Sequence, residues 1–215
     1  IGSMFKKGQN GRIPIVAVTG TNGKTTTVRL ISHLLNQNGM RVGMTNTDGV
    51  YVNGDCIDTG DCSGPKSAKS VLLHPDVDAA VLETARGGIL REGLAFDHCD
   101  VAVVTNIGSG DHLGLNFITT VNELAVLKRV IVQNVAPTGA AVLNAADPIV
   151  AKMAPKCKGE VIFFAADITH PVMATHRAQG QAVVYVEGGN IVASKGDTLQ
   201  TIALSEVPIT LNGAI

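Results

Sequence analysis

A continuous apolar run that ends in a glycine-rich turn constrains the fold of this chain more than any other feature. Residues 13–18 (IPIVAV) are aliphatic apart from one proline near the start, as in strands buried on both faces of a sheet. The turn at residues 20–23 follows at once, and residues 28–35 then keep the apolar spacing of a helix that ends near Gly39. A buried strand, a tight turn and a helix in this order are typical of a parallel α/β sheet.

Further strand-like and helix-like segments alternate along the chain. Apolar runs typical of buried strands occupy residues 41–45, 79–82, 101–104, 140–143 and 161–164, and helical patterns occupy residues 65–73, 120–134 and 148–154. Asn53-Gly54 predicts a hairpin over residues 50–57, and residues 188–190 separate two short β-like runs. We therefore expect an α/β fold with a mostly parallel sheet flanked by helices and a small antiparallel β layer near the C-terminus.

Length and composition favour one sizeable domain. The chain has 215 residues and 45% hydrophobic content, which is ample for a core, and we assign residues 11–215 to this domain. Residues 1–10 are interpreted as a tag remnant and linker, because residues 1–4 (IGSM) resemble the scar of a cleaved expression tag.

Charge and hydropathy argue against several classes of partner. The formal net charge is −1, so the chain has no excess of positive charge that would favour binding to nucleic acid or to an anionic membrane. No apolar stretch approaches the roughly 20 residues that span a bilayer. The cysteines form no C-x-x-C pair, which favours reduced structural thiols. We expect a cytoplasmic protein, and the sequence leaves a homo-oligomer open.

The glycine turn has the chemistry of a phosphate-binding loop. Its sequence is Gly20-Thr21-Asn22-Gly23-Lys24-Thr25-Thr26. Glycines let backbone N–H groups face an anion, the next helix presents its positive end, Lys24 adds a cation, and Thr25 can ligate Mg²⁺. The strict G-x-x-x-x-G-K-[ST] pattern needs glycine where Val18 stands, so the loop is a variant. The alternative is a glycine turn that binds no ligand.

Two other strand ends carry polar groups that would face this loop. Glu83 closes the run 79–82, and the carboxyl ends of parallel strands are where ligands bind, so we interpret it as a Mg²⁺ ligand. The alternative is an ordinary acid at a strand end. Asp111-His112 follows the run 101–104. A lone histidine is more often a surface or packed residue, so this pair gains meaning only from its neighbours.

Lys128 interrupts an apolar stripe of the predicted helix. The stripe consists of Val121, Leu124, Ala125, Ile131 and Val132, with Lys128 in its middle. Either the lysine stem packs on the core while the amine reaches water, or the amine turns toward the site. In the second case carbamylation would convert the cation into a carboxylate-like metal ligand. The spacing alone favours neither interpretation.

Taken in chain order, these residues resemble the signatures of the Mur ligase central domain. The matching segments are residues 19–26, Glu83, Asn106, residues 111–113, Lys128 and residues 144–147. Residues 83–91 (ETARGGILR) and 61–65 (DCSGP) resemble, more narrowly, the cyanophycin synthetase branch of that family. The resemblance covers nearly the whole chain from Gly11 onward.

The resemblance implies an ATP- and Mg²⁺-dependent amide ligase. In this chemistry ATP phosphorylates a carboxylate, and an amine then displaces phosphate from the acyl phosphate. The resemblance implies catalytic roles for Lys24, Glu83, His112 and Lys128, nucleotide contacts from Thr21, Asn22, Gly23, Lys24, Thr25, Thr26, Asn144 and Asp147, and metal ligation by Thr25, Glu83, His112 and a carbamylated Lys128.

The cyanophycin synthetase branch implies arginine and a poly-aspartate chain as substrates. Arg86 and Arg91 are candidates to bind a substrate carboxylate, and the alternative is a pair of solvated loop arginines. The resemblance implies that family members continue into an adenine-binding helix and a C-terminal domain, and that the cyanophycin synthetase branch also carries an N-terminal ATP-grasp portion. We therefore expect a central domain that is cut before the adenine-binding helix and that is inactive alone.

Other classes of function stay open at this point. One is the central domain of a peptidoglycan Mur ligase or a folylpolyglutamate-type ligase. Another is a nucleotide-binding domain that does not catalyse a reaction. An unrelated P-loop kinase or GTPase is disfavoured, because the sequence has no Asn-Lys-x-Asp motif for reading guanine.

Overall fold

The computed structural model describes residues 11–108, 113–114 and 117–207. The strands are β1 Ile15–Thr19, β2 Val42–Thr45, β3 Gly49–Val52, β4 Asp55–Thr59, β5 Ala79–Glu83, β6 Cys99–Val104, β7 Val135–Asn144, β8 Glu160–Phe164, β9 Val183–Glu187, β10 Asn190–Lys195 and β11 Thr198–Ala203. The helices are α1 Lys24–Gln37, α2 Pro65–Leu72, α3 Arg86–Glu92, α4 Val121–Lys128, α5 Val130–Gln133, α6 Pro148–Ala151 and α7 Pro171–Ala178, with short 3₁₀ turns at Ala154–Lys156 and Leu204–Glu206. Residues 1–10, predicted to be a tag remnant and linker, lie outside this description.

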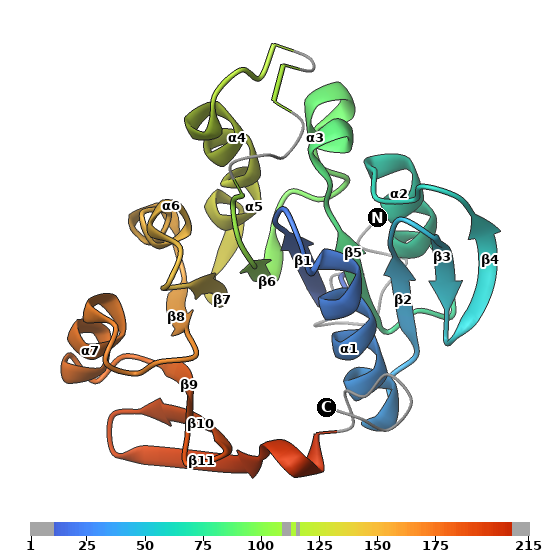
Figure 1. The fold of residues 1–215 in the computed structure, drawn as a ribbon. Helices are drawn as coiled ribbons and strands as arrows, with labels where there is room; N and C mark the ends of the chain where they lie inside the picture. The colour runs from blue at the N-terminus through green and yellow to red at the C-terminus, as the bar shows by residue number, and fades with distance from the viewer. Residues whose placement is uncertain (1–10, 109–112, 115–116, 208–215) are drawn as a thin grey trace.

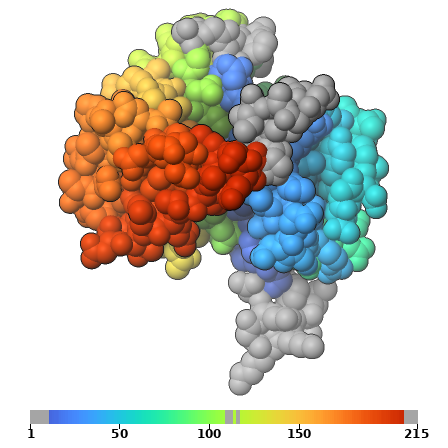
Figure 2. Space-filling view, turned by 60° about the horizontal axis from the view of Figure 1, so that its bottom comes forward, coloured from blue at the N-terminus to red at the C-terminus, as the bar shows by residue number. Residues whose placement is uncertain are grey.

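The described strands form one 11-stranded sheet in the order β11-β10-β9-β8-β7-β6-β1-β5-β2-β3-β4 (Figure 1). The strands from β9 to β2 in this order pair in parallel, and antiparallel strands extend the sheet at both ends. In Figure 2 the two ends lie on opposite sides of the molecule, with β10 and β11 in red and β3 and β4 in cyan. The predicted fold class is therefore confirmed, and the antiparallel C-terminal strands continue the main sheet.

Helices cover the two faces of the sheet unequally. On one face, Val28 of α1 packs with Val18 and Val81 in a small apolar cluster. On the other face a larger cluster joins the sheet to α2 and to α4 through α7, with Leu124 and Met173 among its members. Burial on both faces explains why the central strands read as unbroken aliphatic runs in the sequence.

The turn chemistry predicted from the sequence is present. Asn53 and Gly54 both have positive φ, 51° and 93°, and they connect β3 to β4. This is the conformation that a two-residue hairpin loop with the right-handed strand twist requires. The glycine-rich segment 188–190 likewise connects the antiparallel pair β9 and β10.

Three helices differ from the sequence expectation. The helix predicted over 120–134 is interrupted at Arg129, whose N–H still donates to the carbonyl of Ala125. Helix α7 was not predicted, and neither was α3, whose paired glycines weaken helix propensity. A Cβ on Gly88 would lie 2.9 Å from Gly64 Cα, so close packing of α3 on the start of α2 accounts for this glycine.

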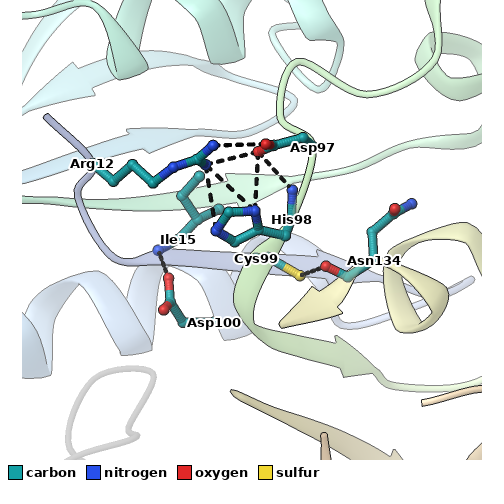
Figure 3. A network of polar contacts seen from close by, with 7 residues as sticks. All are labelled: Arg12, Ile15, Asp97, His98, Cys99, Asp100 and Asn134. Atoms are coloured by element: carbon teal, nitrogen blue, oxygen red, sulfur yellow. Dashed lines mark hydrogen bonds and ion pairs between the residues drawn. The ribbon is translucent and has the colours of Figure 1, made fainter. Parts of the chain in front are cut away.

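A polar network fixes the amino end of β1 against β6 (Figure 3). The Arg12 guanidinium donates to both carboxylate oxygens of Asp97, at 2.8 and 2.7 Å, and it holds the pKa of that carboxyl well below its usual range. Asp100 accepts from the N–H of Ile15 at 2.8 Å. Burial raises the pKa of the neighbouring Cys99 thiol to about 12, which keeps it protonated and unreactive.

Arg41 makes a second such contact at the amino end of β2. Its guanidinium donates to Asp76 at 3.1 Å and to both oxygens of Asp78, at 3.0 and 2.8 Å. The Asp78 carboxylate also accepts from the Arg41 N–H at 3.1 Å. These hydrogen bonds lower the pKa of Asp78 from 3.8 to about 2. The contact joins the segment before β5 to the start of β2.

We expect Asp78→Asn to destabilise the fold at neutral pH but not in strong acid. The folded-state pKa of Asp78 is lowered, so its contribution is complete above about pH 3.8 and is lost as the pH falls through 2. Thermal unfolding of both proteins between pH 7 and pH 2 measures this. Asp197→Asn, an exposed residue of the β10–β11 turn, is the matched control. An Asp78→Asn deficit that is equal at pH 7 and pH 2 would contradict the assignment.

Candidate active site

Among the residues that the structure describes, no side chain caps the N-terminus of α1. Its N-cap residue is Gly23, with φ 83°, which has no side chain to accept the first-turn N–H groups. By contrast, Thr120 caps α4 with a capping box and Asp147 caps α6. The first turn of α1 contains Lys24 and no acidic residue, which the helix dipole disfavours unless an anion binds there. This end of the 14-residue helix is therefore suited to an external anion.

Lys24 folds back over the loop that precedes α1. Its Nζ donates to the carbonyl of Thr21 at 2.9 Å. Thr27 Oγ1 donates to the carbonyl of Gly23 at 2.7 Å and fixes the same turn from within the helix. The ammonium group is thus held across the loop, where it adds positive charge to the helix end.

Glu83 stands beside the loop in a buried position. Strand pairing places it next to Val18 of β1, and its side chain is only 2% exposed. Its Oε2 accepts from Thr25 Oγ1 at 2.8 Å, and Thr25 Oγ1 also contacts Thr47 Oγ1 at 3.2 Å. Glu83 Oε1 has no hydrogen-bond partner among the described residues. A buried carboxylate oxygen without a partner, next to a threonine hydroxyl, fits the hard oxygen ligands that Mg²⁺ prefers.

Lys128 is buried beneath the loop. It is 2% exposed and lies in the chain between Leu124 and Ile131, which both belong to the larger core cluster. Its Nζ donates to the carbonyl of Gly20 at 2.6 Å. Of the two interpretations that the sequence left open, the structure shows the amine turned toward the loop and not toward solvent.

The segment after β6 holds the loop from its other side. Thr105 Oγ1 donates to the Asn22 carbonyl at 2.7 Å, and Asn106 bonds both the N–H and the carbonyl of Asn22 at 3.0 Å. A Cβ on Gly20 would lie 1.9 Å from Thr105 Oγ1, so only glycine fits at this close approach. Thr105 begins the polar segment 105–112 that was expected to converge on the loop, whereas no role was predicted for Thr47, which lies just past the end of β2.

Asn144 and Asp147 anchor the segment after β6 to the next strand and helix. Asn144 Nδ2 donates to the carbonyl of Thr105 at 2.9 Å. Asp147 Oδ2 accepts from the Ile107 N–H at 2.6 Å, while its Oδ1 accepts from the N–H groups of Ile149 and Val150 at the start of α6. Both side chains are thus engaged in internal contacts, and the nucleotide contact implied for them stays a prediction.

Arg86 and Arg91 belong to α3, which follows Glu83 and contacts α4 (Figure 1). They therefore lie in a helix and not in a loop, with Arg86 partly buried and Arg91 exposed. The Arg91 guanidinium lies over Gly87, where a Cβ would be 3.0 Å from its Nη1. Arg86 begins the helix shortly after Glu83 and Arg91 lies in its last turn, and both the substrate role and the alternative of solvated arginines stay predictions.

The strand ends of β1, β5 and β6 converge as the sequence predicts. The structure brings Lys24, Thr25, Glu83 and Lys128 around the loop. Asp111 and His112 lie outside the described residues. Within residues 11–108, 113–114 and 117–207, no group of three or more His, Cys, Asp or Glu side chains is placed to hold a metal ion. A metal site here would need ligands in addition to Thr25 and Glu83.

The sequence of this chain matches a known protein family. The model of the Mur ligase middle domain matches residues 18–207. The chain belongs to the Mur ligase middle-domain family. It is 50% identical over 211 residues to the cyanophycin synthetase of Synechocystis sp., covering 98% of this chain, and 32% identical over 195 residues to the UDP-N-acetylmuramoylalanine–D-glutamate ligase of Pelotomaculum thermopropionicum, covering 91%.

Solved structures of the family have the same fold as this Mur ligase middle domain. A UDP-N-acetylmuramoyl-L-alanyl-D-glutamate–2,6-diaminopimelate ligase superposes with a TM-score of 0.65 at 20% identity, covering 89% of this chain and 39% of that one. The MurF ligase of Thermotoga maritima in complex with ADP superposes with a TM-score of 0.56 at 25% identity, covering 89% and 40%.

The Mur ligase middle domain described here spans only part of its relatives. It covers 24% of the length of the Synechocystis cyanophycin synthetase and 36% of the Pelotomaculum ligase. Among the described helices, none has the length and apolar character needed to cross a membrane.

We expect Asp147→Ala to lower the free energy of unfolding by about 2–4 kcal/mol, because it removes a helix cap and a charged hydrogen bond to Ile107. Asp147→Asn keeps an acceptor oxygen and should lose less. Urea denaturation of the two variants and the parent chain measures the difference. An Asp147→Ala loss below about 0.5 kcal/mol, less than a typical hydrogen bond contributes, would contradict this anchoring role.

Proposed function

We propose that this chain is the ATP-binding central domain of an ATP-dependent amide ligase of the cyanophycin synthetase type. One observation carries the proposal: the uncapped N-terminus of α1, with Lys24 and Thr25, lies against the buried and half-satisfied carboxylate of Glu83. A positive helix end beside a metal-type carboxylate suits a metal–triphosphate ligand. The ADP named with the Thermotoga maritima ligase supports the same nucleotide class.

In the ligase reaction, this domain would position the terminal phosphate of ATP and neutralise the negative charge of its oxygens. ATP transfers its terminal phosphoryl group to a carboxylate, and an amine then attacks the acyl phosphate, so no protein nucleophile is needed. Lys24 and the first-turn N–H groups of α1 bind the phosphate oxygens and stabilise the charge that develops on them. The remaining nucleotide contacts of the loop would come from Thr21, Asn22 and Thr26.

Thr25 and Glu83 would hold a first Mg²⁺, and Glu83, His112 and a carbamylated Lys128 would hold a second. When bound, Mg²⁺ supplies Lewis-acid stabilisation of phosphoryl oxygens. A carbamate nitrogen keeps one N–H, so a carbamylated Lys128 could still donate to Gly20 as the structure shows. Asn144 and Asp147 would act by holding the segment that leads to His112.

The proposed substrates are arginine and the side-chain carboxylates of a poly-aspartate chain. Identity of 50% to a cyanophycin synthetase, against 32% to a peptidoglycan ligase, favours this pair over UDP-muramyl peptides. Arg86 and Arg91 would bind substrate carboxylates through charge-assisted hydrogen bonds. The whole ligase would add an N-terminal ATP-grasp portion, an adenine-binding helix and a C-terminal domain, and would act in the cytoplasm. It would need neither nucleic acid nor a membrane.

We expect Lys24→Ala and Glu83→Gln in the whole ligase to lower ATP consumption with poly-aspartate primer and arginine by roughly a hundredfold or more, because each removes a charge that stabilises phosphoryl transfer. Phosphate release measures the rate. The matched controls are Lys158→Ala and Glu187→Gln, at exposed positions away from the loop.

The same assay separates the proposal from its alternatives. Full activity of both site variants would favour a nucleotide-binding domain that does not catalyse the reaction. Turnover with a UDP-muramyl peptide, and none with poly-aspartate and arginine, would reject the proposed substrates while keeping the ligase chemistry.

A further inference from the structure

The backbone of Asn22 is held on both of its polar groups by the segment after β6. Asn106 Oδ1 accepts from the Asn22 N–H at 3.0 Å, and Asn106 Nδ2 donates to the Asn22 carbonyl at 3.0 Å. Thr105 Oγ1 donates to the same carbonyl at 2.7 Å. The Asn106 side chain therefore satisfies both backbone polar groups of Asn22, as the backbone of a neighbouring strand does within a sheet.

These contacts fix the direction of the next N–H group. No cis peptide bond occurs in the described residues, so the peptide bond from Asn22 to Gly23 is trans. In a trans peptide the C=O and the following N–H point in opposite directions. Because the Asn22 carbonyl points toward Thr105 and Asn106, the Gly23 N–H points away from them.

The same contacts also divide the loop N–H groups into two sets. The Thr21 N–H donates to the Asn106 carbonyl at 2.8 Å and the Asn22 N–H to its side chain, so neither faces an anion. For the N–H groups of Gly23 and of the first turn of α1, which precede the intrahelical hydrogen bonds, no side-chain acceptor occurs among the described residues. The anion-binding backbone therefore begins at Gly23.

We infer that Asn106 is the positioning residue of the phosphate loop: its side chain aligns the Asn22–Gly23 peptide so that the Gly23 N–H points at the bound phosphate. This inference rests on the proposed function for its ligand, a nucleotide phosphate. The two hydrogen bonds between Asn106 and Asn22 are present in the structure whatever the ligand is. Asn106 acts through Asn22 and does not touch the ligand. It also ties the loop to the segment that Asn144 and Asp147 anchor.

Residue-resolved hydrogen exchange of the ligand-free chain tests the contact. In Asn106→Ala we expect the Asn22 amide to exchange at least about tenfold faster, because its acceptor is gone. Amides in the interior of α1 should keep their protection, which shows that the variant is folded. If they do not, Asn106→Asp is the second variant, since it keeps an acceptor for the Asn22 N–H and should preserve its protection. The matched control is Asn190→Ala, at the start of β10, where the side chain likewise donates to a backbone carbonyl, that of Gly188.

Calorimetric titration of the same proteins with Mg·ADP tests the consequence. We expect Asn106→Ala to bind about tenfold more weakly than the parent chain and Asn190→Ala to bind equally well. Unchanged Asn22 exchange in Asn106→Ala would overturn the contact, and faster exchange with unchanged affinity would overturn the positioning role. If the parent chain, which the proposal places without its adenine-binding helix, does not bind Mg·ADP, the same variants are titrated in the whole ligase. Absence of binding there would count against the proposed function, and the exchange result would still decide the contact.

Discussion

The proposed site depends on one electrostatic arrangement: the positive end of α1, without a side-chain cap among the described residues, lies beside the buried carboxylate of Glu83. Neither feature favours the isolated fold, because free helix N–H groups and an unpartnered buried carboxylate oxygen both cost free energy. In the proposed complex, a phosphate and a divalent cation between them would satisfy both. The fold thus retains a local electrostatic defect that a metal-bound phosphate would remove.

The parallel sheet makes this arrangement possible by bringing distant residues to one edge. Strand β1 leads into the loop, β5 ends in Glu83, and β6 leads into Thr105 and Asn106. Lys128 reaches the loop from α4 on the face opposite to α1. Side chains from several elements therefore hold the loop backbone, while the amino-end contacts of Arg12 and Arg41 keep the neighbouring strands in register.

Much of this architecture could be predicted from the sequence, because unbroken aliphatic runs and turn dipeptides are local signals. The strands around β1 and the Asn53-Gly54 hairpin are examples. Helix α3 was missed because paired glycines disfavour a helix, and Gly88 is explained by packing against Gly64, a contact that local propensity does not contain. For the same reason spacing could not choose between the two orientations of Lys128, and it could not show that Asn106 pairs with Asn22. These contacts join residues far apart in the chain.

A crystal structure of the chain with Mg²⁺ and a non-hydrolysable ATP analogue tests the central claim most directly. The account predicts phosphate oxygens within hydrogen-bond distance of the Gly23 and Lys24 N–H groups, with the metal ligated by Thr25 and Glu83. A triphosphate bound elsewhere, with Glu83 far from any metal, would contradict it.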